Sequence, residues 1–218
     1  HPGRPDQPTL PMPISDEAIE QLKADAAAGG ETECASYVIN SQIATLGPGK
    51  IDCDLVINGF SEVTLRGSLW VAGSITVSNT SQVKLASALG NRSAVMIADK
   101  EGDRLGGSAI TLGNTTQFIA RPEDGAYIVL ISQNNSSENG GSVNAISISN
   151  NNPVGDLILY APHGKIDLSN SVQLVEVTAY AINAQNSATI IYDEGAANIL
   201  FSGGPSGGYQ IESWDDIP

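Results

Sequence analysis

The sequence is poor in charged residues, aromatic residues and histidine, and it has no long apolar run. Charged residues make up 16% and aromatic residues 5% of its 218 residues. No segment approaches the roughly 20 consecutive apolar residues of a membrane-spanning helix, so we expect no membrane insertion by this chain. The only histidines are His1 and His163, and no Walker loop or Rossmann fingerprint is present. Triad chemistry and nucleotide binding are therefore disfavoured.

Basic residues are scarce as well. The 10 lysines and arginines are outnumbered by 24 aspartates and glutamates, which leaves a formal net charge of −14. Such a surface repels phosphate backbones and anionic lipid headgroups, so nucleic acid is not an expected partner. An ordinary acidic exterior is the simplest interpretation, and binding of a divalent cation or a basic partner is the alternative.

Small and β-branched residues take the place of the missing classes. The 23 glycines, together with many Ala, Ser, Asn, Thr, Ile and Val residues, are typical of short strands joined by tight turns. We therefore predict an all-β chain with many turns. A chain of this length holds one sizeable core, so we expect one principal domain.

The chain divides into three parts. Residues 1–13 contain five prolines, a density that excludes helices and central strands and predicts an extended linker. Residues 14–30 are predicted to form a helix, because Ser15 is a good N-cap, acidic residues follow it, and Gly29-Gly30 ends the apolar periodicity. We expect this helix to cap the open first coil of the third part, residues 31–218.

Short alternating strands follow one another from about residue 36 to residue 202, and several units end in asparagine. Asparagine tolerates the left-handed backbone that a sharp corner needs, and its amide can bond stacked neighbours. The predicted corner residues are Asn79, Asn114, Asn150, Asn170 and Asn186. Their intervals of 35, 36, 20 and 16 residues predict coils of roughly 16–20 residues, with each long interval spanning two coils.

This recurrence favours a right-handed parallel β-solenoid, also called a β-helix. The irregular spacing leaves a β-sandwich as the alternative, because two packed sheets also consist of short alternating strands. The two folds differ in strand direction. A solenoid stacks parallel strands, whereas antiparallel hairpins would indicate the sandwich.

The two cysteines, Cys34 and Cys53, are 19 positions apart, which is about one turn of a solenoid. That separation would place them side by side on neighbouring coils. We predict a disulfide and hence an oxidising compartment, with two buried free thiols as the alternative. Two cysteines without nearby histidines cannot close a zinc site.

Two groups of acidic residues are candidates for chemistry. Hydrolytic solenoids activate water with aspartates clustered on one face, and here Asp52 and Asp54 share one face of an alternating strand with Lys50. A solvated outer face is the simpler interpretation. The segment Asp99–Asp103 has the alternating oxygen spacing of calcium loops without their full signature. An ordinary polar loop fits it better. We predict no catalytic residue, no metal and no cofactor.

An ordered set of motifs extends along most of the chain. The motifs are Pro11–Gly30, Leu46–Asp52, Leu69–Gly73, Tyr160–Gly164, Val177–Tyr180, Ile191–Asp193, Phe201–Gly208 and Ile211–Trp214. This set resembles uncharacterised surface proteins of candidate-phylum bacteria. Those proteins are similar to PilX-type minor pilins, in which a membrane helix precedes a large β-rich exterior domain. The resemblance implies a repetitive β-fold outside the membrane and a link to pilus-like assemblies, and it transfers no catalytic motif.

These features predict a non-enzymatic, extracellular structural or adhesive module at the cell surface, such as a pilus-like or surface-filament subunit. Stacked coils end in strand edges, so copies are expected to join head to tail where no cap intervenes. Expected partners are other copies, pilus or surface components, and surface glycans. The alternative is a carbohydrate-binding or carbohydrate-active β-helix protein. Trp70 and Trp214 would be its sugar platform, although core packing and a C-terminal cap fit them better.

Overall fold

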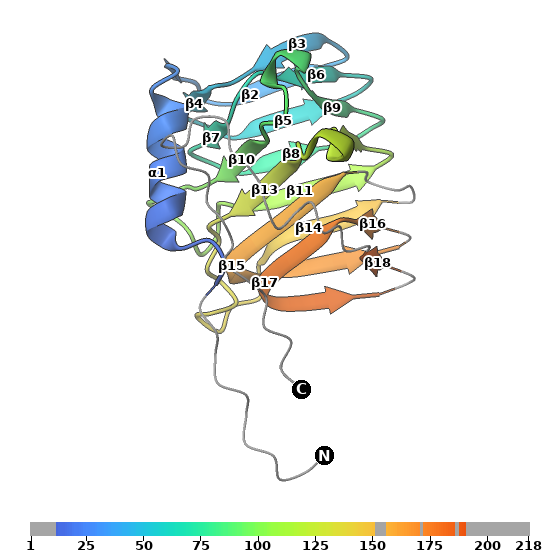
Figure 1. Cartoon of the computed structure of the whole chain (residues 1–218). Coiled ribbons are helices and arrows are strands. Elements are labelled where there is room, and N and C mark those ends of the chain that lie inside the picture. Colours follow the sequence, from blue (N-terminus) through green and yellow to red (C-terminus); the bar gives the residue numbers. More distant parts are fainter. Residues whose placement is uncertain (1–11, 151–155, 171, 186–187, 191–218) are drawn as a thin grey trace.

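The computed structural model describes residues 12–150, 156–170, 172–185 and 188–190. This part of the chain is mostly β, as predicted, with a single α-helix near its start (Figure 1). Within it, no helix has the length and apolar character needed to cross a bilayer. The elements are α1 (Asp16–Ala27), β1 (Glu31–Thr32), β2 (Tyr37–Asn40), β3 (Ile43–Leu46), β4 (Gly49–Ile51), β5 (Leu55–Asn58), β6 (Glu62–Leu65), β7 (Leu69–Val71), β8 (Ile75–Val77), β9 (Gln82–Leu85), the 3-10 helix η1 (Ser87–Leu89), β10 (Ala94–Ala98), β11 (Ile110–Asn114), β12 (Gln117–Ile119), the 3-10 helix η2 (Pro122–Asp124), β13 (Ile128–Ser132), β14 (Asn144–Asn150), β15 (Leu157–Ser169), β16 (Gln173–Leu174), β17 (Glu176–Ala184) and β18 (Thr189–Ile190).

The strands form a curled sheet of parallel neighbours. One path of hydrogen-bonded strands runs β1-β4-β7-β10-β13-β15 and continues β15-β14-β11-β8-β5-β2, while β3, β6, β9 and β12 form a second sheet (Figure 1). The long strand β15 joins the two stretches, because its first part pairs with β13 and its second part with β14. Every pairing between these named strands is parallel. The antiparallel hairpins of a β-sandwich are therefore not found among the described strands.

Successive turns of the curl differ in length. Leu55 pairs with Ile75, Ile75 with Ile110, and Ile110 with Ile146 in one continuous ladder. The intervals of 35 and 36 residues are therefore single turns, and the prediction that each spans two coils is wrong. Loops account for the extra length, because a loop can leave the stack and return without changing the register of the strands that flank it.

Apolar side chains fill the inside of the curl. In β5, Leu55 and Ile57 are fully buried, whereas Val56 and Asn58 are half-buried on the outside. This alternation follows from the strand geometry, which points successive side chains to opposite faces. Parallel pairing stacks the inward residue of one strand directly above its paired residue on the next strand. Most of these inward residues belong to one apolar cluster that runs through the curl.

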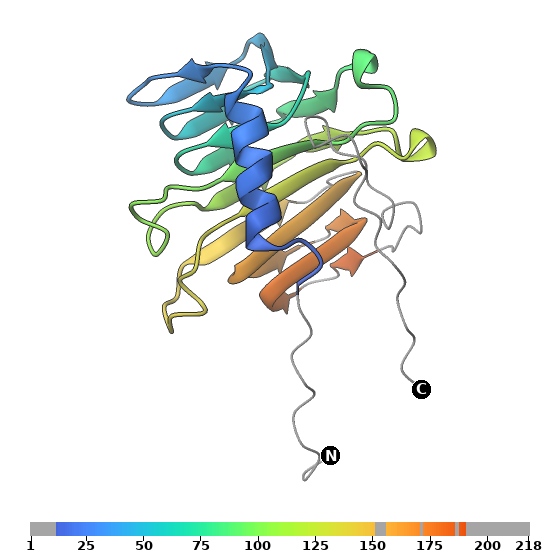
Figure 2. The same ribbon diagram turned by 60° about the vertical axis from the view of Figure 1, so that its left-hand side comes forward.

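Helix α1 covers the outer side of strands that are apolar on both faces. β10, β13 and the first part of β15 are buried at every position. Their outward side chains pack with Ile19 and Leu22 of the helix, which begins after the predicted N-cap Ser15. Figure 2 shows α1 lying along the side of the stack, across successive strands. The predicted end cap is therefore not what the structure shows, because the apolar stripe of α1 packs on an apolar sheet face.

Several predicted corner asparagines have the expected backbone. Asn79, Asn114 and Asn170 adopt positive φ angles of 58°, 57° and 71°. The amide of Asn114 donates a hydrogen bond to the side-chain oxygen of Asn79, which is the stacking contact proposed from the sequence. Asn150 pairs with Asn114 through the backbone register, and Asn186 lies outside the described residues.

Candidate functional site

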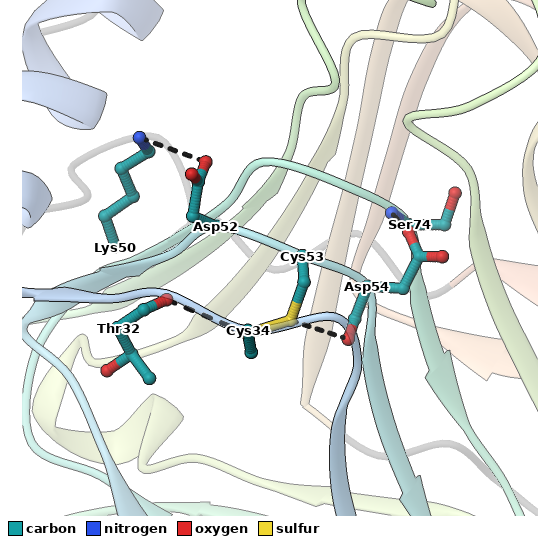
Figure 3. Close-up of a disulfide and its surroundings, with 7 residues drawn as sticks. All are labelled: Thr32, Cys34, Lys50, Asp52, Cys53, Asp54 and Ser74. Atoms are coloured by element: carbon teal, nitrogen blue, oxygen red, sulfur yellow. Dashed lines mark hydrogen bonds and ion pairs between the residues drawn. A yellow bond between two sulfur atoms is a disulfide. The ribbon is translucent and has the colours of Figure 1, made fainter.

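A disulfide joins the first two turns, as predicted. Cys34 and Cys53 are bonded, with their Cα atoms 5.6 Å apart (Figure 3). They follow β1 and β4, which are parallel neighbours in the sheet. The bond therefore ties the edge of the stack to the next turn, and it limits the freedom of the unfolded chain.

The two carboxylates beside the disulfide do not act together. Asp52 lies 3.2 Å from the Lys50 ammonium, whereas Asp54 accepts a 2.8 Å hydrogen bond from the backbone N–H of Ser74. Figure 3 shows the two side chains directed toward these different partners. The pKa of Lys50 is raised, chiefly by its hydrogen bond to Glu31. This arrangement matches the solvated outer face preferred from the sequence.

A group of ions centred on two buried side chains, Lys23 and Asp99, joins α1 to the sheet. The Nζ atom of Lys23 donates to Asp99 at 2.7 Å, to Glu101 at 2.6 Å and to Glu20 at 2.9 Å. Arg104 donates two further hydrogen bonds of 2.7 Å to Asp99. Lys23 is 2% exposed and Asp99 is fully buried. These five residues are called the Lys23 cluster below.

Trp70 borders the Lys23 cluster. The Nζ atoms of Lys23 and Lys50 lie 4.6 Å and 4.7 Å from the centroid of its ring, within the range of cation–π attraction. The indole N–H donates to the backbone carbonyl of Asp99 at 3.3 Å. Two ammonium groups thus lie against the ring of Trp70, which favours a packing role for this residue over a sugar platform. Trp214 lies outside the described residues.

The contacts of Lys23 keep its side chain charged. Burial alone would lower the pKa of this lysine, but hydrogen bonds to Asp99, Glu101 and Glu20 outweigh burial and raise the pKa. The pKa of Arg104 is raised as well, first by its hydrogen bonds to Asp99. A lysine that stays protonated at neutral pH is neither a base nor a nucleophile. The cluster is therefore suited to holding α1 in place.

Three carboxylates of the Lys23 cluster lie close to one another. Oxygen atoms of Glu20, Asp99 and Glu101 lie within 4.8 Å of one another, a spacing that suits a cation. An ammonium group already lies among them and bonds all three. Asp103, the last acid of the predicted calcium segment, accepts a 2.9 Å hydrogen bond from the backbone N–H of Gly106. The ordinary polar loop preferred from the sequence fits these contacts.

A second set of polar contacts holds the start of α1. His163 lies 3.0 Å from Asp16 through Nε2 and 2.8 Å from Glu138 through Nδ1. The Tyr160 hydroxyl donates to the backbone carbonyl of Ile14 at 2.5 Å and accepts from its N–H at 3.2 Å. Burial is the main cause that raises the pKa of Tyr160 to about 12. The phenol therefore stays protonated at neutral pH, and the contacts position the helix.

The first turn ends in strand edges without a partner among the described residues. β2 pairs with β5 alone and β3 with β6 alone. Large apolar side chains are exposed on this turn, with Val38 at 53% and Ile43 at 85%. Open edges are surfaces on which another strand can pair. This end of the stack is therefore the candidate interaction surface.

The Lys23 cluster was not predicted, although the sequence contains two signals for it. Lys23 lies four positions after Ile19 and three before Ala26, so it shares the buried face of the helix with these two residues. Asp99 directly follows the run Ala94–Ala98, which is apolar at every position. A buried lysine and a buried aspartate each need an opposite charge, and pairing them would have placed the helix on this strand.

Comparison with known proteins gives no match. No protein-family model fits the chain, and no curated protein and no solved structure is significantly similar to it.

Proposed function

We propose that the chain is a right-handed parallel β-solenoid that serves as a non-enzymatic structural or adhesive module of a pilus-like or other surface assembly. The observation that carries this proposal is the unbroken stack of parallel strands around a filled apolar core. Repeat folds of this kind form elongated bodies whose neighbouring turns support one another. Such a body suits a spacer or a display surface.

The proposed location outside the cytoplasm rests on the disulfide and on the resemblance to PilX-type surface proteins. Disulfides persist in oxidising compartments and are rare in the cytosol. The bond between Cys34 and Cys53 closes the turn at the exposed end of the stack, where an extracellular module benefits most from a covalent tie. Antibody labelling of intact cells that express the protein tests this location, and a signal seen only after permeabilisation would contradict it.

The non-enzymatic role is supported by the state of the ionisable side chains. Asp52 and Asp54 have separate partners, and the Lys23 cluster pairs its acids with Lys23 and Arg104. A glycan array together with a polysaccharide-cleavage assay tests the role against the carbohydrate-active alternative. Binding without turnover is expected for an adhesive module. Robust turnover by the purified chain would refute the proposal.

A further inference from the structure

We propose that copies of this chain join head to tail, with β2 of one copy pairing in parallel with β17 of its neighbour. This inference rests on the proposed structural role and names the partner of the exposed first turn. The two strands lie at opposite ends of the same stack, as Figure 1 shows.

The backbone groups on the open side of the first turn have no strand partner within the part of the chain that the structure describes. The N–H groups of Tyr37 and Ser41 donate to carbonyls next to and within β5. Successive residues of a strand direct their N–H and C=O groups to opposite sides. Val38 and Asn40 therefore direct theirs away from β5, toward the side where the described residues provide no strand. These groups are available to a parallel strand of another molecule.

The far end of the stack offers a strand of matching direction. Among the described residues, β17 pairs in parallel with β15 alone, and it spans both stretches of the curled sheet. In β17, Ile182 is paired with the buried Ile166 but is itself 47% exposed. The half of β17 that contains Ile182 continues the stretch that begins with β2. Pairing with β2 would place Ile182 beside Tyr37 and Ile39, the inward residues of the next copy.

Charge makes a second copy the fitting partner. Residues 37–46 and residues 177–185 contain no Asp, Glu, Lys or Arg, although the chain carries a net charge of −14. Two copies of such an acidic protein repel each other wherever their acidic surfaces meet, and they approach most easily through uncharged surfaces. Natural sheets usually protect open edges with charged residues, as Glu31 does in β1. β2 and β3 have no such protection.

The experiment compares two variants of the full chain with equal charge change. Val38→Glu places a carboxylate on the outer side of the edge strand β2. Thr76→Glu, the matched control, lies in the same outward row two turns inside the stack, because Val38 pairs with Val56 and Val56 with Thr76. Sedimentation velocity over a concentration series and negative-stain microscopy measure assembly. Thermal unfolding confirms that both variants fold.

For the wild-type chain we expect an open series of oligomers and rods that lengthen with concentration. Val38→Glu is expected to weaken association by up to about fivefold, and Thr76→Glu is expected to leave it unchanged. A wild-type chain that stays monomeric up to its solubility limit would overturn the inference, as would equal weakening by both variants. Neither outcome bears on the surface location or on glycan turnover, so the proposed function is judged separately.

A mixing experiment tests the head-to-tail direction. Ile182→Lys alters the β17 end and leaves β2 intact, whereas Val38→Glu does the reverse. Each variant alone is expected to be monomeric at a concentration where the wild type assembles, and an equal mixture is expected to form a one-to-one dimer that grows no further. A dimer formed by Ile182→Lys alone would indicate head-to-head pairing of β2 edges and would refute the proposed arrangement.

Discussion

Replacing Asp99 with asparagine tests whether the Lys23 cluster holds α1 on the sheet. The substitution keeps the size of the side chain but removes the buried negative charge that Lys23 and Arg104 share. Removing one partner of a buried ion pair costs about 3–5 kcal/mol. Glu20 and Glu101 remain beside Lys23 but are 55% and 58% exposed, so they compensate only in part. We expect the free energy of unfolding to fall by about 3 kcal/mol.

Replacing Lys23 with methionine is expected to lower the free energy of unfolding by less than Asp99→Asn does. The methionine keeps apolar packing under the helix, and Asp99 keeps both hydrogen bonds from Arg104. The loss is then mainly that of charged hydrogen bonds, about 2 kcal/mol. Because Lys23 and Asp99 contact each other directly, the double variant should lose about 1–3 kcal/mol less than the sum of the two single losses.

Urea denaturation followed by far-UV circular dichroism measures these free energies. Lys84→Met is the control, because Lys84 also bonds a glutamate, Glu62 at 3.0 Å, but is 39% exposed. An exposed pair of this kind is worth about 0–1 kcal/mol, so the control should remain close to the wild type. The reasoning fails if Asp99→Asn unfolds at the same urea concentration as the control, or if the losses in the double variant are additive.

Three further predictions follow from the other contacts. Replacing Cys34 and Cys53 with serine should lower the free energy of unfolding by about 3 kcal/mol, since the closed loop between them no longer restricts the unfolded chain, and reduced wild type should match the double variant. Asn114→Ala should lower the free energy of unfolding by about 1–2 kcal/mol, because alanine is strained in the left-handed backbone at this position. Asn114→Gly should lower it less. Equal losses in thermal unfolding would contradict the corner role. The pKa of Tyr160 is raised from 10.0 to about 12, so its stabilising effect is complete below about pH 10 and is lost as the pH rises toward 12. In urea series at neutral and alkaline pH, Tyr160→Phe should therefore lose less stability on alkalinisation than the wild type.

The local features of the fold could be predicted because they depend on near neighbours in the sequence. Alternation in segments such as Leu55–Asn58 follows from strand geometry. The left-handed corners at Asn79 and Asn114 follow from residue type. The disulfide between Cys34 and Cys53 spans one short turn, so its spacing was informative.

Features that depend on the count of turns could not be predicted in the same way. The interval from Ile75 to Ile110 is one turn that contains a loop, but a sequence interval alone does not distinguish one long turn from two short ones. The contact between Lys23 and Asp99 joins residues 76 positions apart, and its register depends on that same count. The position of the helix was open to inference, because the runs Ala94–Ala98 and Ile128–Ile131 are apolar on both faces and require cover.

The position of α1 also determines which edge of the stack stays open for assembly. A helix across the first turn would cover the open side of β2 and would keep a strand of another molecule away from Val38 and Asn40. The structure instead places α1 beside β4 and β7 and against the outer faces of β10, β13 and β15. The helix therefore protects an apolar side of the stack and leaves the uncharged edge of the first turn uncovered by any described element. Since one surface needs cover for folding and the other is open to a partner, stability and assembly should respond to different substitutions.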